Sequence, residues 1–530
     1  MESILNWEYI SLIPPLLTLL LVVLTRKVGI SLGVGILTSA FVVAGADIME
    51  TLRMIWNSFA IIFVDGGAIN TWNAFILIFL SLLGIMTAFI NMSGGARAFT
   101  AWALTKVKSR KGANMATALL GIIVFIDDYF SALIVGQVAK PLTDKYNVSR
   151  AKLAYLIDTT ASPISVIAPI SSWGAGIMGL VAPLIAAAGM VAVTPFQAFV
   201  YMIPMNFYVL TAVAMMFIVI LTRFDIGAMR KHESLAINDG QVVGDAREVP
   251  GETDEELPVH QQGSAKALIV PILGLAFTVI IAMFVTGAVT GGSMNIFSIF
   301  ENTLVTHSLV IGGIVGLLLS LFYFFRYTHS DDDFGKTEIW LGVKTGFMAM
   351  FPAILVLTLA WMIGDLIGQL GTGELLGSMV ESSNMPTGIL LAVVFAVACL
   401  MALATGTSWG SFGILIPITG EIMISLDATD LLLPSIAAVL AGAVFGDHCS
   451  PISDSTILSS TGAGCNHIVH VMTQLPYAIG SAMIALAGYL VLGLTSSLPL
   501  ALLTLLVLLI IVVVVSKVVY TPIIKKSAES

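Results

Sequence analysis

The chain has 530 residues, of which 58% are hydrophobic and only 10% are charged, and its mean hydropathy is +1.00. These values lie far outside those of soluble domains and exclude a water-soluble globular protein. The formal net charge is -9 and comes largely from the polar stretch 223–262. An acidic chain without a basic patch argues against a nucleic acid partner. The high hydropathy instead indicates that the lipid bilayer surrounds the chain.

Long apolar segments predict the membrane spans. Because lipid cannot satisfy backbone polar groups, a span must be a helix of roughly 20 residues or a strand of a closed barrel, and these segments do not alternate as barrel strands do. The expected segments are 9–25, 28–46, 72–91, 113–139, 150–190, 196–222, 266–287, 304–325, 350–370, 387–420, 431–465, 473–494 and 497–516. Polar residues interrupt 113–139, 150–190, 387–420 and 431–465. We predict an all-α polytopic membrane protein with about 11 to 13 membrane segments, including broken helices and re-entrant hairpins.

The charged residues near the ends of these segments predict an orientation. Glu2 and Glu8 precede the first segment in place of the basic residues of a signal peptide, so we expect that segment to stay in the mature protein. Basic residues in short loops mark the cytoplasmic side. They place 26–27, 97–111, 223–231 and the tail at 525–526 in the cytoplasm, with the N-terminus outside the inner (plasma) membrane. The basic residues after segment 113–139 would lie outside if that segment crossed, which favours a re-entrant hairpin there.

A repeated sequence divides the chain into halves. Residues 162–165 and 450–453 both read Ser-Pro-Ile-Ser, and the stretch at 127–131 can be aligned with that at 407–411. Internal similarity of this kind is typical of transporters, and the charge rule gives the halves opposite orientations. We predict two inverted-topology repeats, 1–222 and 266–494, and an extra C-terminal transmembrane helix with a cytoplasmic tail at 495–530. Accidental recurrence of Ser-Pro in a serine-rich chain is the alternative.

The halves are joined by a polar segment, 223–265, which we interpret as a cytoplasmic linker. It is rich in Glu, Asp and Gln and contains Pro250 and Pro258. A segment of this composition has too few apolar residues to form a core of its own. We therefore expect the linker to have little structure.

Six aspartates lie in apolar segments that offer no obvious Lys or Arg partner: Asp127, Asp128, Asp158, Asp365, Asp447 and Asp454. By default, an ionisable residue in a membrane segment marks a substrate pathway or a proton relay. Burial disfavours the ionised carboxylate, so such a group can hold a proton at one stage and a cation at another. Asp127, Asp128, Asp447 and Asp454 are the Na+ candidates. A position at the water interface, where a carboxylate needs no partner, is the alternative.

Hydroxyl groups beside the proline breaks supply further candidate ligands. Pro163 and Pro451 each remove a helical hydrogen bond and leave carbonyl groups free, and discontinuous helices in transporters bind Na+ through oxygens of this kind. The candidate ligands are Thr159, Ser162, Ser165, Thr405, Thr407, Ser408, Ser450 and Ser453. For the break near Gly406, a helix kink without a ligand role is the alternative.

The histidines near the second Ser-Pro break have different expected roles. His448 lies between Asp447 and Cys449, but the sequence does not supply the four ligands of a structural zinc site. A histidine beside intramembrane acids can relay protons or sense pH, so His448 joins the candidate site. His467 and His470 are expected at the cytoplasmic edge, in contact with water. We expect no cofactor, and Na+ and H+ as the transported or coupling ions.

The string Gly-Asp-His-Cys-Ser-Pro-Ile-Ser-Asp at 446–454, followed by Ser459 and Ser460, resembles the NhaC family of Na+/H+ antiporters in the ion transporter superfamily. Residues 127–129 and 158–174 are similar to the first half of that family, and the resemblance extends from about residue 30 to 490. It implies secondary transport energised by ion gradients, with Na+ and H+ as the default solutes. The resemblance also reaches branches that carry amino acids or organic anions, such as malate and lactate exchange or methionine uptake.

Three functional hypotheses remain open on this basis. The first is a Na+/H+ antiporter whose carboxylates exchange ions by alternating access. The second is a Na+- or H+-coupled transporter, such as a symporter, of an amino acid or small carboxylate, in which Tyr129, Trp173 and Trp409 either line a solute pocket or only pack. The third is an intramembrane serine hydrolase, because 406–410 matches G-x-S-x-G. That motif requires a strand-to-helix elbow, so we expect no enzyme. Homo-oligomer formation is left open.

Overall fold

The computed structural model describes residues 9–25, 27–125, 127–169, 171–190, 193–244, 257–260, 263–292, 296–328, 335–372, 375, 387–518 and 523. Within these residues the fold is almost entirely helical. The strands found there are β1 (Val64–Asp65) and β2 (Ala68–Ile69), which form one short antiparallel hairpin.

The helices follow one another with short connections. Up to residue 239 they are η1 (Ile10–Leu12), α2 (Ile13–Thr25), α3 (Val28–Val43), α4 (Ile48–Ala60), α5 (Thr71–Met92), α6 (Gly95–Lys106), α7 (Arg110–Ile123), α8 (Asp128–Lys145), α9 (Arg150–Thr160), α10 (Ser162–Ser165), α11 (Ser172–Ala187), α12 (Pro195–Met202), η2 (Ile203–Met205), α13 (Phe207–Thr222) and α14 (Gly227–Asp239). After it they are α15 (Lys266–Gly291), α16 (Ile296–Glu301), α17 (Val305–Thr328), α18 (Lys336–Gln369), α20 (Thr387–Thr405), α21 (Ser408–Ser425), η3 (Thr429–Leu431), α22 (Leu432–Cys449), α23 (Asp454–Ala463), α24 (His467–Thr495) and α25 (Leu498–Val518).

The predicted all-α polytopic membrane fold is confirmed. Nine helices among the described residues are long and apolar enough to cross a membrane, and three shorter apolar helices accompany them: Gly29–Val43, Gly176–Ala187 and Ser408–Ile424. The helices differ in how much of their apolar surface is buried inside the protein, as expected when some face lipid and others face protein. Only 11% of the apolar stretch of α25 is buried inside the protein, whereas 83% of that of α22 is buried. The exposed helix α25 is accordingly almost entirely apolar, while the buried helix α22 carries Asp447 and His448.

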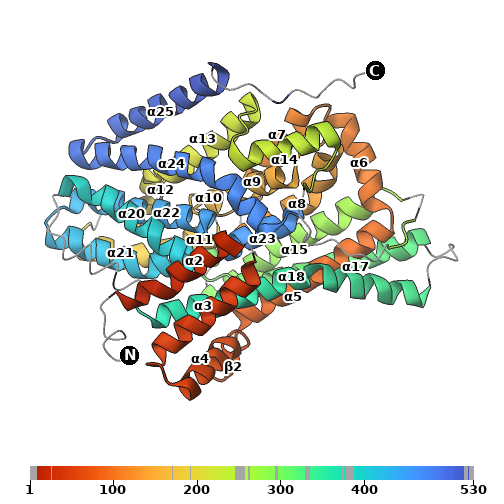
Figure 1. The fold of residues 1–530 in the computed structure, drawn as a ribbon, viewed down its shortest axis with the longest axis horizontal. Coiled ribbons are helices and arrows are strands. Elements are labelled where there is room, and N and C mark those ends of the chain that lie inside the picture. The colour runs from red at the N-terminus through yellow and green to blue at the C-terminus, as the bar shows by residue number, and fades with distance from the viewer. Residues whose placement is uncertain are drawn as a thin grey trace.

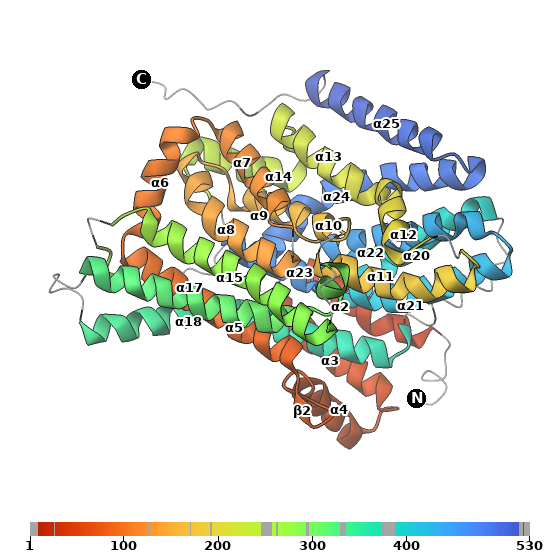
Figure 2. The same ribbon diagram turned by 180° about the vertical axis from the view of Figure 1, so that it is seen from behind.

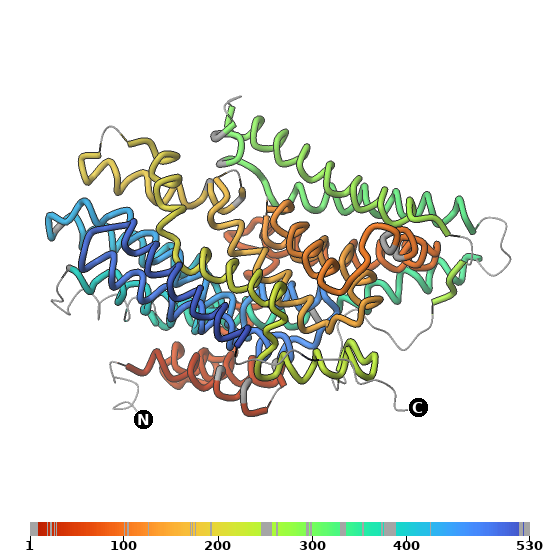
Figure 3. The backbone as a smooth tube through the Cα atoms, turned by 90° about the horizontal axis from the view of Figure 1, so that it is seen from above, coloured from red at the N-terminus to blue at the C-terminus, as the bar shows by residue number. Residues whose placement is uncertain are grey.

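The long helices run roughly along the long axis of the molecule and form two bundles (Figure 1). In one bundle α15 packs on α17, and α5 packs on both α17 and α18. In the other, α20 packs on α22 and α24, and α24 packs on α13 and α25. Figure 2 shows the broken helices α8, α10, α11 and α23 between the bundles, and Figure 3 shows α15 and α17 on the opposite side of the molecule from α2 and α3.

Segment 113–139 lies in a helical hairpin. Helix α7 ends at Ile123, α8 begins at Asp128, and the two helices pack against each other. The hydroxyl of Tyr146, just after α8, donates to the carbonyl of Val107, just before α7. The chain returns to the place where it entered, so both ends of this hairpin lie on one side of the molecule, as a re-entrant hairpin requires.

A second hairpin enters from the opposite end of the molecule (Figure 1). It is formed by α20 and α21, which meet at Gly406 and Thr407. Gly406 has a φ of 72°, and a Cβ atom there would lie 2.7 Å from the carbonyl oxygen of Ile452. A glycine is needed because both the left-handed backbone and this close approach exclude a side chain. The other predicted breaks lie between α10 and α11 and between α22 and α23. The division into two inverted repeats stays a prediction.

The polar linker is more structured than its composition predicts. Gly227–Asp239 forms α14, and the carboxylate of Glu233 is buried, accepting hydrogen bonds from Arg110 and from the backbone N–H of Ser149 at 2.9 Å. Lys152 lies 3.6 Å from Glu233 and pairs with Asp225. The prediction of little structure is wrong for this part, because buried ion pairs hold α14 against α9 and the base of the first hairpin. Residues 245–256 of the linker lie outside the described residues.

Candidate functional site

The helix breaks meet at one cavity of about 540 Å³ between the two bundles. Its wall is formed by the hairpin tips and by α11, α22 and α23 on one side, and by α5, α16, α17 and α18 on the other. The carboxylates in the wall are Asp127, Asp128, Asp365, Asp447 and Asp454. The hydroxyl residues in the wall are Tyr129, Thr303, Thr306, Thr405, Thr407 and Ser408, and the tryptophans are Trp72, Trp173, Trp361 and Trp409.

Asp127 and Asp128 are held at the tip of the first hairpin. Asp127 caps α8 by accepting a hydrogen bond from the N–H of Phe130 at 3.0 Å, which satisfies one free donor of the helix N-terminus. Asp128 accepts from the indole Nε1 of Trp173 at 2.9 Å and from the hydroxyl of Ser162 at 3.1 Å. Both donors belong to the broken segment that contains α10 and α11, so that break fixes the orientation of the Asp128 carboxylate.

Asp447 lies in the last turn of α22 and is surrounded by hydroxyl groups. It accepts hydrogen bonds from Ser408 at 2.9 Å, from Ser455 at 3.1 Å and from Ser453. Hydroxyl donors stabilise an ionised carboxylate, and each hydroxyl also carries lone pairs that can turn towards a cation. The hydroxyl groups can therefore donate to the carboxylate when no cation is bound and coordinate the cation when one is bound.

Asp454 begins α23 on the far side of the same break. It accepts a hydrogen bond from the hydroxyl of Tyr129, the neighbour of Asp128, and one from the N–H of Ser455 at 2.8 Å. Tyr129 thus connects the first hairpin with α23. Tyr129 and Asp454 are 325 residues apart in sequence, and their contact brings the carboxylates of the two halves to one site.

The structure brings only part of the predicted ligand set to the cavity wall. Residues in the wall are Asp127, Asp128, Thr405, Thr407, Ser408, Asp447 and Asp454. Ser162 and Ser453 lie behind the wall and donate to its carboxylates. Ser165 and Ser450 donate to the backbone carbonyls of Phe125 at 3.3 Å and Leu403 at 2.9 Å, so they hold the hairpin tips in place.

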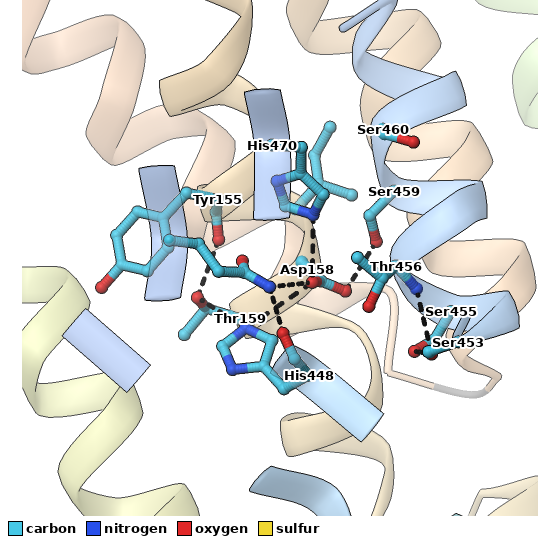
Figure 4. A network of polar contacts seen from close by, with 12 residues as sticks. Tyr155, Asp158, Thr159, His448, Ser453, Ser455, Thr456, Ser459, Ser460 and His470 are labelled. Atoms are coloured by element: carbon cyan, nitrogen blue, oxygen red, sulfur yellow. Dashed lines mark hydrogen bonds and ion pairs between the residues drawn. The ribbon is translucent and has the colours of Figure 1, made fainter. Parts of the chain in front are cut away.

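Asp158 lies in an enclosed polar network behind the cavity wall (Figure 4). Its carboxylate accepts from Ser459 at 2.9 Å and from Gln474 at 2.7 Å, and it contacts Nε2 of His470 at 3.1 Å. Nε2 of His448 is 3.8 Å from the carboxylate and 3.3 Å from the hydroxyl of Thr159. Asp158, Thr159 and His448 are therefore placed together behind the cavity wall, which they do not line, and His448 directly follows the wall residue Asp447.

The expectation of contact with water is wrong for His470, whereas His467 is partly exposed. His470 is 0% exposed, and Nε2 of His467 lies 2.8 Å from the carbonyl oxygen of Pro451. The reason is that α24 begins inside the protein, directly after the tight turn at Gly464. His470 and Gln474 were missed as partners of Asp158. Their spacing of four residues, which puts both on one helix face, is the signal that could have found them.

The charged side chains described in the cavity wall all have the same sign. Every charged side chain that the structure describes in the wall is a carboxylate. In the described ranges, no three of the His, Cys, Asp and Glu side chains come together in a way that could hold a metal ion. A Na+ ion in the cavity would therefore need hydroxyl or carbonyl oxygens in addition to carboxylate oxygens.

Ser408 does not lie in the geometry that a serine hydrolase needs. It is the first residue of α21 and follows another helix, α20, whereas the nucleophile elbow joins a strand to a helix. Its hydroxyl donates to Asp447 at 2.9 Å and to the carbonyl of Ala443 at 3.3 Å. These contacts make Ser408 a partner of the Asp447 carboxylate.

Comparison with known proteins gives the family. The sequence profile of the Na+/H+ antiporter family matches residues 164–494. An uncharacterised protein of Haemophilus influenzae is 41% identical over 92% of this chain and 91% of its own length. The malate-2H+/Na+-lactate antiporter of Bacillus subtilis is 29% identical over 37% of this chain and 40% of its own length. An uncharacterised Na+/H+ antiporter of Haemophilus influenzae is 37% identical over 27% of this chain and 30% of its own length. The chain belongs to the Na+/H+ antiporter family.

Proposed function

We propose that this chain is a secondary active transporter that exchanges Na+ for H+ across the inner (plasma) membrane. The observation that carries the proposal is the position of Asp128, Asp447 and Asp454 at helix ends around one cavity, where every charged side chain described in the wall is acidic. Membership of the Na+/H+ antiporter family supports the same function.

The chemistry follows from the burial of these carboxylates. An ionised carboxylate surrounded by lipid and protein is costly without a counter-charge. The cavity side chains offer no basic partner among the described residues, so a Na+ ion or a proton supplies the compensation. Because both bind the same oxygens, loading Na+ from one side displaces protons, and loading protons from the other displaces Na+. Exposure of the cavity to one side at a time turns this competition into exchange.

The distribution of basic residues supports a cytoplasmic position for one end of the molecule. Arg97, Arg110, Lys231, Lys266 and Lys336 lie on α6, α7, α14 and the first turns of α15 and α18, which gather at one end in Figure 1. The described connecting segments 44–70 and 426–431, at the opposite end, contain one basic residue, on α4. By the positive-inside rule the first end faces the cytoplasm, which puts the N-terminus outside and the C-terminus inside.

The size of the cavity favours a second candidate function, ion-coupled transport of an organic solute. About 540 Å³ is within the range of roughly 300 to 1,000 Å³ that small-molecule pockets occupy, and it is far more than a Na+ ion fills. Trp173 and Trp409 give part of its wall an apolar surface. In this case the carboxylates hold the coupling ion.

Everted membrane vesicles with an imposed pH gradient test the proposal. Added Na+ should collapse the gradient in vesicles that contain the protein, and Asp447→Asn should shift the response to much higher Na+ concentrations. Asp430→Asn is the matched control, because Asp430 is exposed on η3 and does not line the cavity. A gradient that does not respond to Na+, Li+ or K+ would remove the exchange hypothesis.

A further inference from the structure

We propose that the cavity also accepts a small organic cation, a primary amine or diamine, whose ammonium group binds the carboxylates in place of Na+. The inference rests on the proposed function, because it assigns a second class of cargo to the same transport cavity. It is carried by two properties of the wall, the sign of its charges and the position of its aromatic rings.

The sign of the wall charges selects a cation. The carboxylates come from both sides of the cavity, with Asp365 on α18 and with Asp128, Asp447 and Asp454 on α8, α22 and α23. Helix dipoles change this balance little at three of the breaks, because α8, α21 and α23 begin where α7, α20 and α22 end. Positive and negative helix ends offset each other. An organic anion would meet repulsion on both sides, whereas an ammonium group meets attraction.

The aromatic rings provide the second part of an ammonium site. The ring centroids of Trp173 and Trp409 are 5.4 Å apart, and Phe412 packs against both. Trp173 also donates to Asp128 from the edge of its ring, so an indole ring and a carboxylate are adjacent. A cation within about 6 Å of an indole face is attracted by the ring electrons. A carboxylate beside indole rings is therefore a suitable site for an ammonium group with an alkyl chain.

Gly176 fixes the Trp409 ring in this position. A Cβ atom on Gly176 would lie 2.5 Å from Cη2 of Trp409, so the indole lies directly on the backbone of α11. Both residues line the cavity. The close packing holds the ring as a rigid wall, and a rigid wall costs little conformational entropy when a ligand binds.

The volume of the cavity suits the alkyl part of such a cargo. A chain of a few methylene groups can contact the tryptophans while its ammonium group contacts a carboxylate, and the cavity of about 540 Å³ has room for both. A diamine can contact carboxylates on both sides at once. We therefore expect a diamine to bind more tightly than a monoamine of the same length.

Binding is measured on the purified full-length protein, because free amines cross bilayers and collapse pH gradients by themselves. The probes are butylamine and 1,4-diaminobutane, with butyrate and succinate as anions of matched length. Both amines should raise the Tm with increasing concentration, and added Na+ should weaken their apparent affinity. The anions should leave the Tm unchanged.

Two substitutions separate the aromatic wall from general effects. Trp409→Leu should weaken amine binding about 5- to 30-fold, the loss that corresponds to a cation–π contact of about 1 to 2 kcal/mol, and Trp409→Phe should recover most of it. The control is Trp340→Leu, because Trp340 is 68% exposed on α18 and does not line the cavity. Cooperative melting of each variant shows that it is folded.

The outcomes distinguish this inference from the function on which it rests. Na+/H+ exchange without amine binding, or anions that bind as well as the amines, overturns the inference and leaves the exchange function standing. Amine binding without any response to Na+ supports the organic cation and removes the Na+/H+ function. Wild-type amine affinity in Trp409→Leu overturns the assigned site.

Discussion

The Asp447→Asn substitution changes the charge of the cavity with little change in shape. Asp447 accepts three hydroxyl hydrogen bonds, among them those of Ser408 at 2.9 Å and Ser455 at 3.1 Å. Asparagine keeps one acceptor oxygen but removes the negative charge that attracts a cation. Loss of one partner from a buried charge pair costs about 2 to 5 kcal/mol. The Na+ concentration for half-maximal exchange should therefore rise between roughly 30-fold and several thousand-fold.

The hydroxyl groups around Asp447 allow a weaker substitution to be compared with Asp447→Asn in the same assay. Ser408→Ala removes one hydrogen bond to the carboxylate, worth about 1.5 to 3 kcal/mol, so its effect should be smaller, roughly 10- to 150-fold. The measurement is the Na+ dependence of the exchange rate in everted vesicles, with Asp430→Asn as the control. If Asp447→Asn exchanged Na+ at the wild-type concentration and rate, the assignment of Asp447 as a cation ligand would be refuted.

Three further predictions concern the framework around the cavity. Gly136→Ala should lower stability by about 1 to 3 kcal/mol, measured as a lower Tm in detergent, because its Cβ would lie 2.4 Å from the backbone of Gly462 on α23. Glu233→Gln should lower stability by about 3 kcal/mol, the lower end of the cost of breaking a buried ion pair, because Asp225 still contacts Lys152. A cysteine that replaces exposed Lys145 should react with an impermeant maleimide from the cytoplasm, and one that replaces Asp430 should react from outside.

Each of these predictions has a control in the same chain. Gly179 has open space around its Cα, so Gly179→Ala should not lower the Tm. The exposed pair of Glu50 and Arg53 contributes little, so Glu50→Gln should stay within about 0.5 kcal/mol of the wild type. The native cysteines are buried and give a low labelling background. Labelling of both engineered cysteines from one side would contradict the hairpin topology.

Much of the cavity could be predicted from local chemistry. Proline and hydroxyl residues in an apolar segment weaken the helix wherever they occur, so the breaks beside Ser162 and Ser450 are visible in the sequence. An aspartate such as Asp128 or Asp447 in a membrane segment is costly enough to mark a functional position by itself. Of the six aspartates that the sequence indicates, all but Asp158 line one cavity.

The remaining parts depend on packing that no local pattern encodes. Asp158 lies near the Ser-Pro break in sequence, but the rotation of α9 directs it towards His470 and Gln474 on α24. Trp72 and Trp361 reach the cavity from the other bundle, so nothing near the breaks in sequence indicates them. Tertiary contacts also determine that α24 begins inside the protein. The sequence alone therefore predicts a position at the membrane edge for His470.

Proton release on Na+ binding tests the central claim most directly. Purified protein in weakly buffered detergent solution is titrated with NaCl, with choline chloride as the ionic-strength control, while the pH is recorded. Competition for shared carboxylates predicts that Na+ binding releases protons, and that Asp447→Asn releases fewer. Na+ binding without proton release, or release that is unchanged in Asp447→Asn, would contradict the account.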